Sequence, residues 1–167
     1  MKRSSADSPW VTWGLYVFAV TLILSPMVDL VTTVWPVRPT DMGWRYGTLG
    51  LAAGYVQTPL LGAILAMGVS YWQERAGALR LWSVLCLVGT VILLISMVTF
   101  GLDVVSMRSV RPPDAQSGIL AGGLFQEAKY AGACLVSAFL GIGGRQVAAA
   151  MPRATAATGS PGSLRGD

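Results

Sequence analysis

The chain has 167 residues, of which 53% are hydrophobic and only 12% are charged, with a formal net charge of +4 and a mean hydropathy of +0.58. This charged fraction is about half that of an ordinary soluble domain, so the composition indicates an integral membrane protein. The sequence contains no histidine, which excludes the commonest side chain for metal binding, haem ligation and proton relay.

Four apolar segments are long enough to cross a bilayer, whose hydrocarbon core of about 30 Å requires roughly 20 helical residues. The spans are predicted at about 10–35, 45–72, 80–105 and 120–144. The fourth span includes Glu127 and Lys129, and its helix is expected to begin between Gly118 and Phe125. The predicted fold class is all-α, with four transmembrane helices in an antiparallel bundle, an N-terminal segment at 1–9 and a flexible tail at 146–167.

The first apolar segment follows Lys2 and Arg3, as the apolar region of a secretory signal peptide would. The apolar stretch nevertheless continues to Trp35, and no small-x-small cleavage pattern lies near Ser25 and Pro26. We therefore expect this segment to be a retained helix.

The positions of the Lys and Arg residues predict the orientation, because cytoplasmic segments hold an excess of them. Seven of the 12 lie in the N-terminal segment, the second loop and the C-terminal segment, so both termini are expected in the cytoplasm, with a bacterial inner membrane as the setting. The six tryptophans lie close to the ends of the predicted spans, as indole rings at the headgroup level do. No nucleic-acid partner is expected, because no basic helix or aromatic stacking pattern is present.

Two loops of the sequence share a pattern. The first outer loop reads Val37-Arg38-Pro39-Thr40-Asp41, and the third reads Val110-Arg111-Pro112-Pro113-Asp114. A duplicated helical hairpin would produce this similarity, and chance resemblance in a chain of biased composition is the alternative. In either case the prolines cannot continue a helix, so each loop is expected to be a stiff extended segment.

Five charged residues are predicted near the outer membrane face: Asp29, Arg45, Asp103, Glu127 and Lys129. A carboxylate inside the apolar region is costly unless it is paired, protonated or hydrated. Two ion pairs within hairpins are therefore expected, Asp29 with Arg45 and Asp103 with Lys129, and Glu127 could join either. Salt bridges that hold the hairpins together are the favoured hypothesis; a proton or cation site of two facing aspartates is the alternative.

Small residues four apart in sequence predict where membrane helices approach closely. They occur in the second and fourth spans, which are expected to be the close-packed elements of the bundle, at Gly43, Gly47, Gly50 and Gly54 and at Ala133, Ser137 and Gly141. Pro26 and Pro59 predict helix kinks, with a broken-helix transport site around Gln57 as the alternative to a simple kink at Pro59. The third span is bulky all round and is expected to face lipid, pigment or another subunit.

The sequence shows no catalytic or metal-ligating pattern. Cys86 and Cys134 lie in different spans without a CxxC neighbour, and no glycine-rich phosphate loop is present. We expect no enzyme activity and no cofactor. Binding of lipid or pigment at the helix faces is compatible with the sequence. The predicted function is that of an accessory subunit packed against other subunits of a larger membrane complex, such as a respiratory or photosynthetic assembly. The alternative is a small oligomeric transporter of protons, cations or solutes that uses Asp29 and Asp103.

Overall fold

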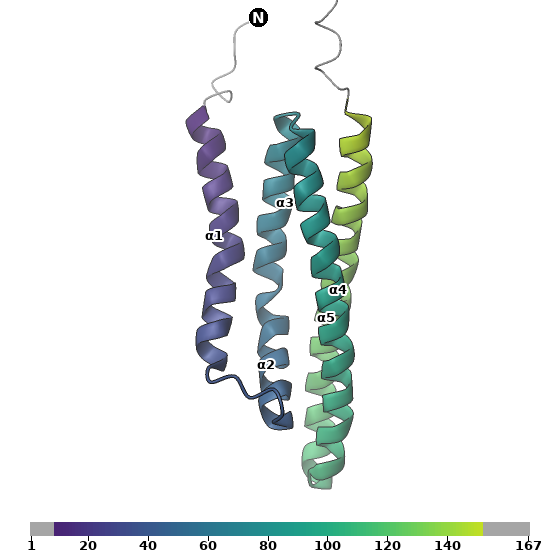
Figure 1. Cartoon of the computed structure of the whole chain (residues 1–167). Helices are drawn as coiled ribbons and strands as arrows, with labels where there is room; N and C mark the ends of the chain where they lie inside the picture. The colour runs from purple at the N-terminus through teal and green to yellow at the C-terminus, as the bar shows by residue number, and fades with distance from the viewer. Residues whose placement is uncertain (1–8, 152–167) are drawn as a thin grey trace, which may run out of the picture.

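The computed structural model describes residues 9–151. All regular secondary structure in this range is α-helix. The helices are α1 Pro9–Val34, α2 Met42–Tyr55, α3 Gln57–Trp72, α4 Ala76–Val110 and α5 Pro113–Ala150 (Figure 1). Because α2 continues into α3 as one interrupted segment, the described chain contains four apolar spans. The predicted fold of four antiparallel membrane-spanning helices is confirmed.

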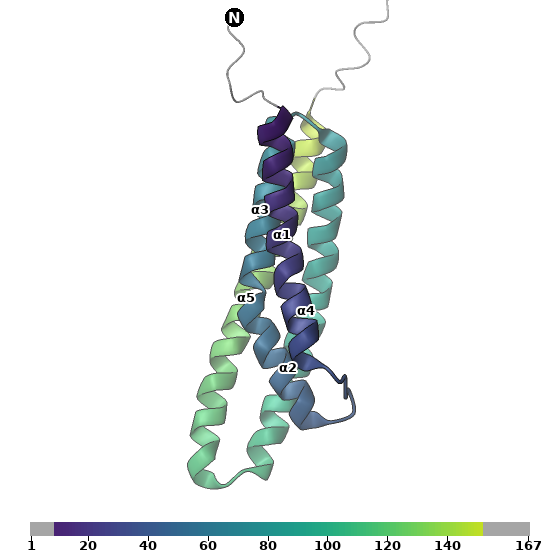
Figure 2. The ribbon, with the colours of Figure 1, turned by 90° about the vertical axis from the view of Figure 1, so that its left-hand side faces the viewer.

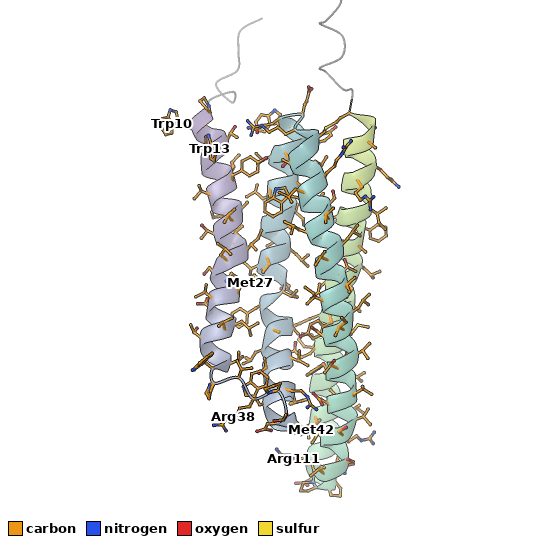
Figure 3. The ribbon with its side chains drawn as sticks, viewed as in Figure 1. Trp10, Trp13, Met27, Arg38, Met42 and Arg111 are labelled. Atoms are coloured by element: carbon orange, nitrogen blue, oxygen red, sulfur yellow. The ribbon has the colours of Figure 1, made fainter. Side chains whose placement is uncertain are left out.

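The two ends of the bundle differ in what they contain (Figures 1 and 2). One end holds the start of α1, the α3–α4 turn and the end of α5, and we call it the termini end. The other holds the α1–α2 loop and the α4–α5 turn, and we call it the loop end. Trp10 and Trp13 lie at the termini end, whereas Arg38 and Arg111 lie at the loop end (Figure 3).

The second hairpin is much longer than its predicted spans. Helix α5 begins at Pro113, not between Gly118 and Phe125, because proline is well tolerated in the first helical turn, where its missing N–H costs no hydrogen bond. The 35 residues of α4 and 38 of α5 correspond to about 52 and 57 Å of helix, well beyond a hydrocarbon core of about 30 Å. The α4–α5 turn accordingly projects beyond the α1–α2 loop (Figure 2).

The two similar loops both end in an aspartate at a helix start. Asp41 caps α2, and its Oδ1 accepts hydrogen bonds from the backbone N–H groups of Gly43 at 2.8 Å and Trp44 at 3.3 Å. Asp114 lies in the first turn of α5, where a carboxylate interacts favourably with the helix dipole. Helix-start chemistry therefore accounts for the aspartate of both loops without requiring a duplication.

The second span is interrupted at Val56, between α2 and α3. Pro59 follows within one turn and has no N–H to donate to the carbonyl of Tyr55, which removes one hydrogen bond of a continuous helix. Helix α1, in contrast, runs through Pro26 without an interruption. Gln57 is exposed at the break, so its side chain does not line an enclosed path in the described structure.

The helices pack mainly on their neighbours in sequence. Helix α5 packs along α4, α1 packs along α3, and α2 and α3 join the two pairs. Within residues 9–151, α1 makes no contact with α4 or α5. The most extensive contact is between α4 and α5, since the short α4–α5 turn makes those two helices antiparallel neighbours along their length. The second and fourth spans, expected to be the close-packed elements, are the two spans with the larger buried share.

Close approach occurs at Gly141, which is among the expected packing residues, and at Gly62, but not at the expected glycines of α2. A Cβ at Gly62 would lie 2.7 Å from the backbone oxygen of Ala19 on α1, and one at Gly141 would lie 2.6 Å from Leu87 Cγ on α4. A Cβ added at Gly47 or at Gly54, in contrast, would have no atom of another element within 4 Å. Gly43 approaches only the Asp41 cap, and Gly50 only the Phe100 ring, at 3.7 Å.

The remaining predicted packing residues lie on the buried side of α5, but they face α4. Ala133 is 5% exposed and Ser137 2% exposed, and the Ser137 hydroxyl donates a hydrogen bond to the carbonyl of Cys86 on α4 at 2.7 Å. The small-residue pattern of the fourth span thus correctly marks a contact face of α5, whereas the partner helix is α4.

Candidate functional site

The charged residues at the loop end form one ion pair between the two hairpins. The Arg45 guanidinium on α2 donates from Nη2 to Asp103 Oδ1 at 2.7 Å and from Nε to Asp103 Oδ2 at 3.1 Å. Its Nη1 donates to the carbonyl oxygen of Pro39 at 3.1 Å. Because Asp103 is only 4% exposed, this two-pronged contact compensates a carboxylate that would otherwise be buried without a partner.

An aromatic layer lies next to this pair. Phe100, one turn before Asp103 on α4, stacks on Tyr46 of α2 with ring centroids 5.3 Å apart and packs at a tilt against Tyr130 of α5 at 6.2 Å. The Tyr130 hydroxyl donates to the carbonyl of Leu49 on α2 at 2.6 Å. Three helices therefore meet around the ion pair, and its side chains are held in fixed positions.

The pairs expected from the sequence are not formed. Arg45 binds Asp103 instead of Asp29, and Asp29 is exposed on α1. The ammonium group of Lys129 lies over the Phe125 ring, 4.6 Å from its centroid. The physical reason is the packing: α1 lies against α3 and does not reach α4, so the buried side of α4 presents Asp103 to α2.

Asp29 therefore has no salt-bridge partner among residues 9–151, where the Arg45–Asp103 pair is the one ion pair present. The hydroxyls of Thr32 and Thr33 donate to the backbone carbonyl of Asp29, at 3.0 and 2.7 Å, and leave its carboxylate unbonded. Asp29 and Asp103 lie on helices that do not touch each other.

Glu127 on α5 does not take part in the Arg45–Asp103 ion pair and lies against Gly101 of α4. Its Oε1 would be 2.9 Å from a Cβ at that glycine. This oxygen is buried and has no hydrogen-bond partner in the described part of the chain. Gly101 thus leaves room for a carboxyl group between α4 and α5.

The described residues show no arrangement typical of a metal or redox centre. No group of three or more Cys, Asp or Glu residues there is placed to hold a metal ion. Cys86 and Cys134 are both buried and unpaired within the described range, on α4 and α5 respectively. Cys86 belongs to an apolar cluster with Ala63, Met67 and Leu79, in which cysteine packs as a small hydrophobic residue.

Two concave regions lie at the ends of the bundle. At the loop end, an open concavity of about 520 Å³ is lined by the α1–α2 loop and α2, including Trp35, Arg38 and Trp44. At the termini end, a smaller cavity of about 240 Å³ lies between α1 and the α3–α4 turn. Trp13 and Arg75 are far apart in sequence, and their meeting in one cavity depends on the packing of α1 against α3.

These features define an integral membrane protein with four antiparallel apolar helices and a cross-hairpin ion pair at the loop end. Comparisons with protein-family models, with curated proteins and with solved structures find no match for the chain.

Proposed function

We propose that this protein is a non-catalytic accessory subunit that packs against a larger membrane complex through α1. One observation carries the proposal: α1 places a carboxylate, Asp29, on its exposed surface and within its apolar length. Intramembrane carboxylates normally face a protein partner, because a charge in contact with lipid is costly. A neighbouring helix that brings a Lys, an Arg or a hydrogen-bond donor to this depth removes that cost.

The depth of Asp29 follows from the length of α1. The 26 residues of this helix span about 39 Å, and Asp29 lies about 8 Å before its end at Val34. If α1 is centred on a hydrocarbon core of about 30 Å, the Asp29 backbone lies roughly 3 Å inside the core. The aspartate side chain is too short to bring its charge far into the headgroup region.

Most of the other exposed residues of α1 are apolar, and the polar ones are the uncharged Thr21, Ser25, Thr32 and Thr33. Val17, Leu24 and Val28 are 62%, 54% and 59% exposed, and α2 and α3 are the elements that hold α1 in the described structure. Such a helix offers a long apolar surface with one acidic group near its end. This combination suits a partner helix that is apolar along its length and basic near the same membrane face.

The fixed geometry of the loop end favours this structural role over transport. A proton or cation path through Asp29 and Asp103 would need the two carboxylates to face each other, whereas α1 and α4 do not touch. The carboxylate of Asp103 is also occupied by Arg45 through both of its oxygens. Within one chain, these two aspartates therefore act separately.

The setting of the complex is proposed from the sequence. The bias of Lys and Arg toward the termini end supports a cytoplasmic location for both termini. A bacterial inner membrane is proposed from the abundance of Ala, Gly, Arg and Val in the sequence, and an energy-transducing assembly from the combination of a small helical chain, bulky apolar helix faces and no histidine.

The proposal predicts that replacing Asp29 by leucine weakens assembly at least tenfold. Breaking one side of a buried charge pair at an interface costs about 2 to 5 kcal/mol, and 1.4 kcal/mol corresponds to tenfold. The measurement is the fraction of the chain that migrates with a larger species on native gels after mild detergent extraction. The matched control is Asp114→Leu, which removes an exposed aspartate in the first turn of α5. Equal assembly of the two variants would show that Asp29 has no partner.

A further inference from the structure

The cavity at the termini end combines a cation with polar and aromatic walls. Thr12, Trp13 and Tyr16 line it from α1, and Gln73 and Arg75 line it from the α3–α4 turn. Its volume of about 240 Å³ is several times the roughly 30 Å³ that a water molecule occupies in the liquid. Among the described residues that line it, Arg75 is charged and none is a carboxylate, so these walls favour a negatively charged group.

The walls of the cavity are fixed by hydrogen bonds. The Ser70 hydroxyl donates to the carbonyl of Ala66 at 2.7 Å, so the contact of 2.8 Å between Tyr16 and Ser70 is a donation from the tyrosine hydroxyl. This bond holds the Tyr16 ring against α3. Gln73 Oε1 is buried without a hydrogen-bond partner in the described structure, so the protein leaves this amide oxygen for another donor.

The α3–α4 turn brings Arg75 to the cavity. Glu74 has a φ of 54°, the left-handed conformation that reverses the chain direction between α3 and α4. The Arg75 N–H donates to the carbonyl of Ser70 at 3.0 Å and closes the turn. Helix α4 then begins at Ala76 without a side-chain cap, so the positive end of its dipole lies beside Arg75.

The position of the cavity in the membrane identifies its ligand. Trp13 belongs to it, and Trp10 lies one turn away at the same end of α1 (Figure 3). Tryptophan rings at a span end mark the headgroup level, where phospholipid phosphates lie. A basic pocket between helices at this level fits the headgroup of an anionic lipid.

We propose that this cavity binds the phosphate of an anionic phospholipid headgroup. Arg75 donates charge-assisted hydrogen bonds to the phosphate oxygens, and a headgroup hydroxyl supplies a donor for Gln73 Oε1. Trp13 packs against the glycerol and the upper part of an acyl chain. This site is independent of the α1 surface around Asp29 and of any partner subunit.

The test is a titration of the full-length protein in detergent with phosphatidylglycerol and, separately, phosphatidylcholine, followed by native mass spectrometry. Arg75→Gln is expected to weaken phosphatidylglycerol binding at least fivefold. Arg80→Gln removes the same charge from an exposed position of α4 that does not line the cavity, and it is expected to change binding less than twofold. Arg75→Lys keeps the charge and is expected to bind between the wild type and Arg75→Gln, which also controls for a folding defect.

The outcomes separate the sources of the phosphate. If millimolar inorganic phosphate displaces the lipid, the cavity is a site for free phosphate and the lipid proposal is overturned. It is also overturned if phosphatidylcholine binds as tightly as phosphatidylglycerol, or if Arg75→Gln and Arg80→Gln lose the same amount of binding. A selective loss at Arg75 with no competition by phosphate supports the site.

Discussion

Replacement of Arg45 by alanine is expected to lower the free energy of unfolding by about 2 to 3 kcal/mol. The variant leaves Asp103 buried without its partner, and loss of one member of a buried pair typically costs about 3 to 5 kcal/mol. The expected loss is smaller because the Arg45 side chain is 34% exposed, which allows water to reach the pair. Reversible unfolding by SDS in mixed micelles measures the difference.

Two controls show whether the loss belongs to the pair. Arg108→Ala removes an exposed charge from the same helix as Asp103 and is expected to change stability by less than about 0.5 kcal/mol. The double variant Arg45→Met, Asp103→Leu removes both charges and is expected to be close to the wild type, because no buried charge remains unpaired. A double variant as unstable as Arg45→Ala would contradict this explanation of the pair.

Replacement of Gly62 by alanine is expected to cost about 1 to 3 kcal/mol. The added Cβ would lie 2.7 Å from the backbone oxygen of Ala19 and 2.8 Å from Ile23 Cγ1, and a backbone atom cannot turn aside as a side chain can. Helix α1 would have to move away from α3, which loses packing along the contact. SDS unfolding of the variant measures this loss.

Gly54→Ala is the matched control for Gly62→Ala. It lies in the same interrupted span. Apart from its chain neighbours and the backbone of its own helix, no atom lies within 4 Å of its added Cβ. Alanine also restricts the unfolded backbone more than glycine does, so this variant is expected to keep or slightly raise stability. If both variants behave alike, the close approach of α1 and α3 at Gly62 is contradicted.

The number and approximate limits of the spans could be predicted from the sequence, because hydropathy over a bilayer thickness is a local property. The ends of α4 and α5 could not, since the proline-rich stretch resembles a longer loop. In the structure only Arg111 and Pro112 separate the two helices, and Pro113 begins the next helix in a position that suits it. The predicted flexible tail at 146–167 is wrong at its start, because α5 continues to Ala150. The rest of that tail from 152 onward and residues 1–8 of the predicted N-terminal segment lie outside the described residues.

The partner of Arg45 could not be predicted because it depends on how the hairpins pack. Sequence proximity suggested Asp29, the acidic residue of the same hairpin. The partner of Arg45 depends instead on which side of each helix is buried. Asp103 lies on the buried side of α4, and Asp29 lies on the exposed side of α1. The same long-range packing brings Trp13 and Arg75 to one cavity, which no local pattern indicates.

The migration of the wild-type chain on a native gel after mild detergent extraction tests the central claim most directly. The accessory-subunit proposal predicts a species much larger than the 17.6 kDa chain, with a second membrane protein in constant proportion to it and loss of that protein in Asp29→Leu. A lone species of about the mass of the chain, from membranes extracted under conditions that preserve other complexes, would contradict it.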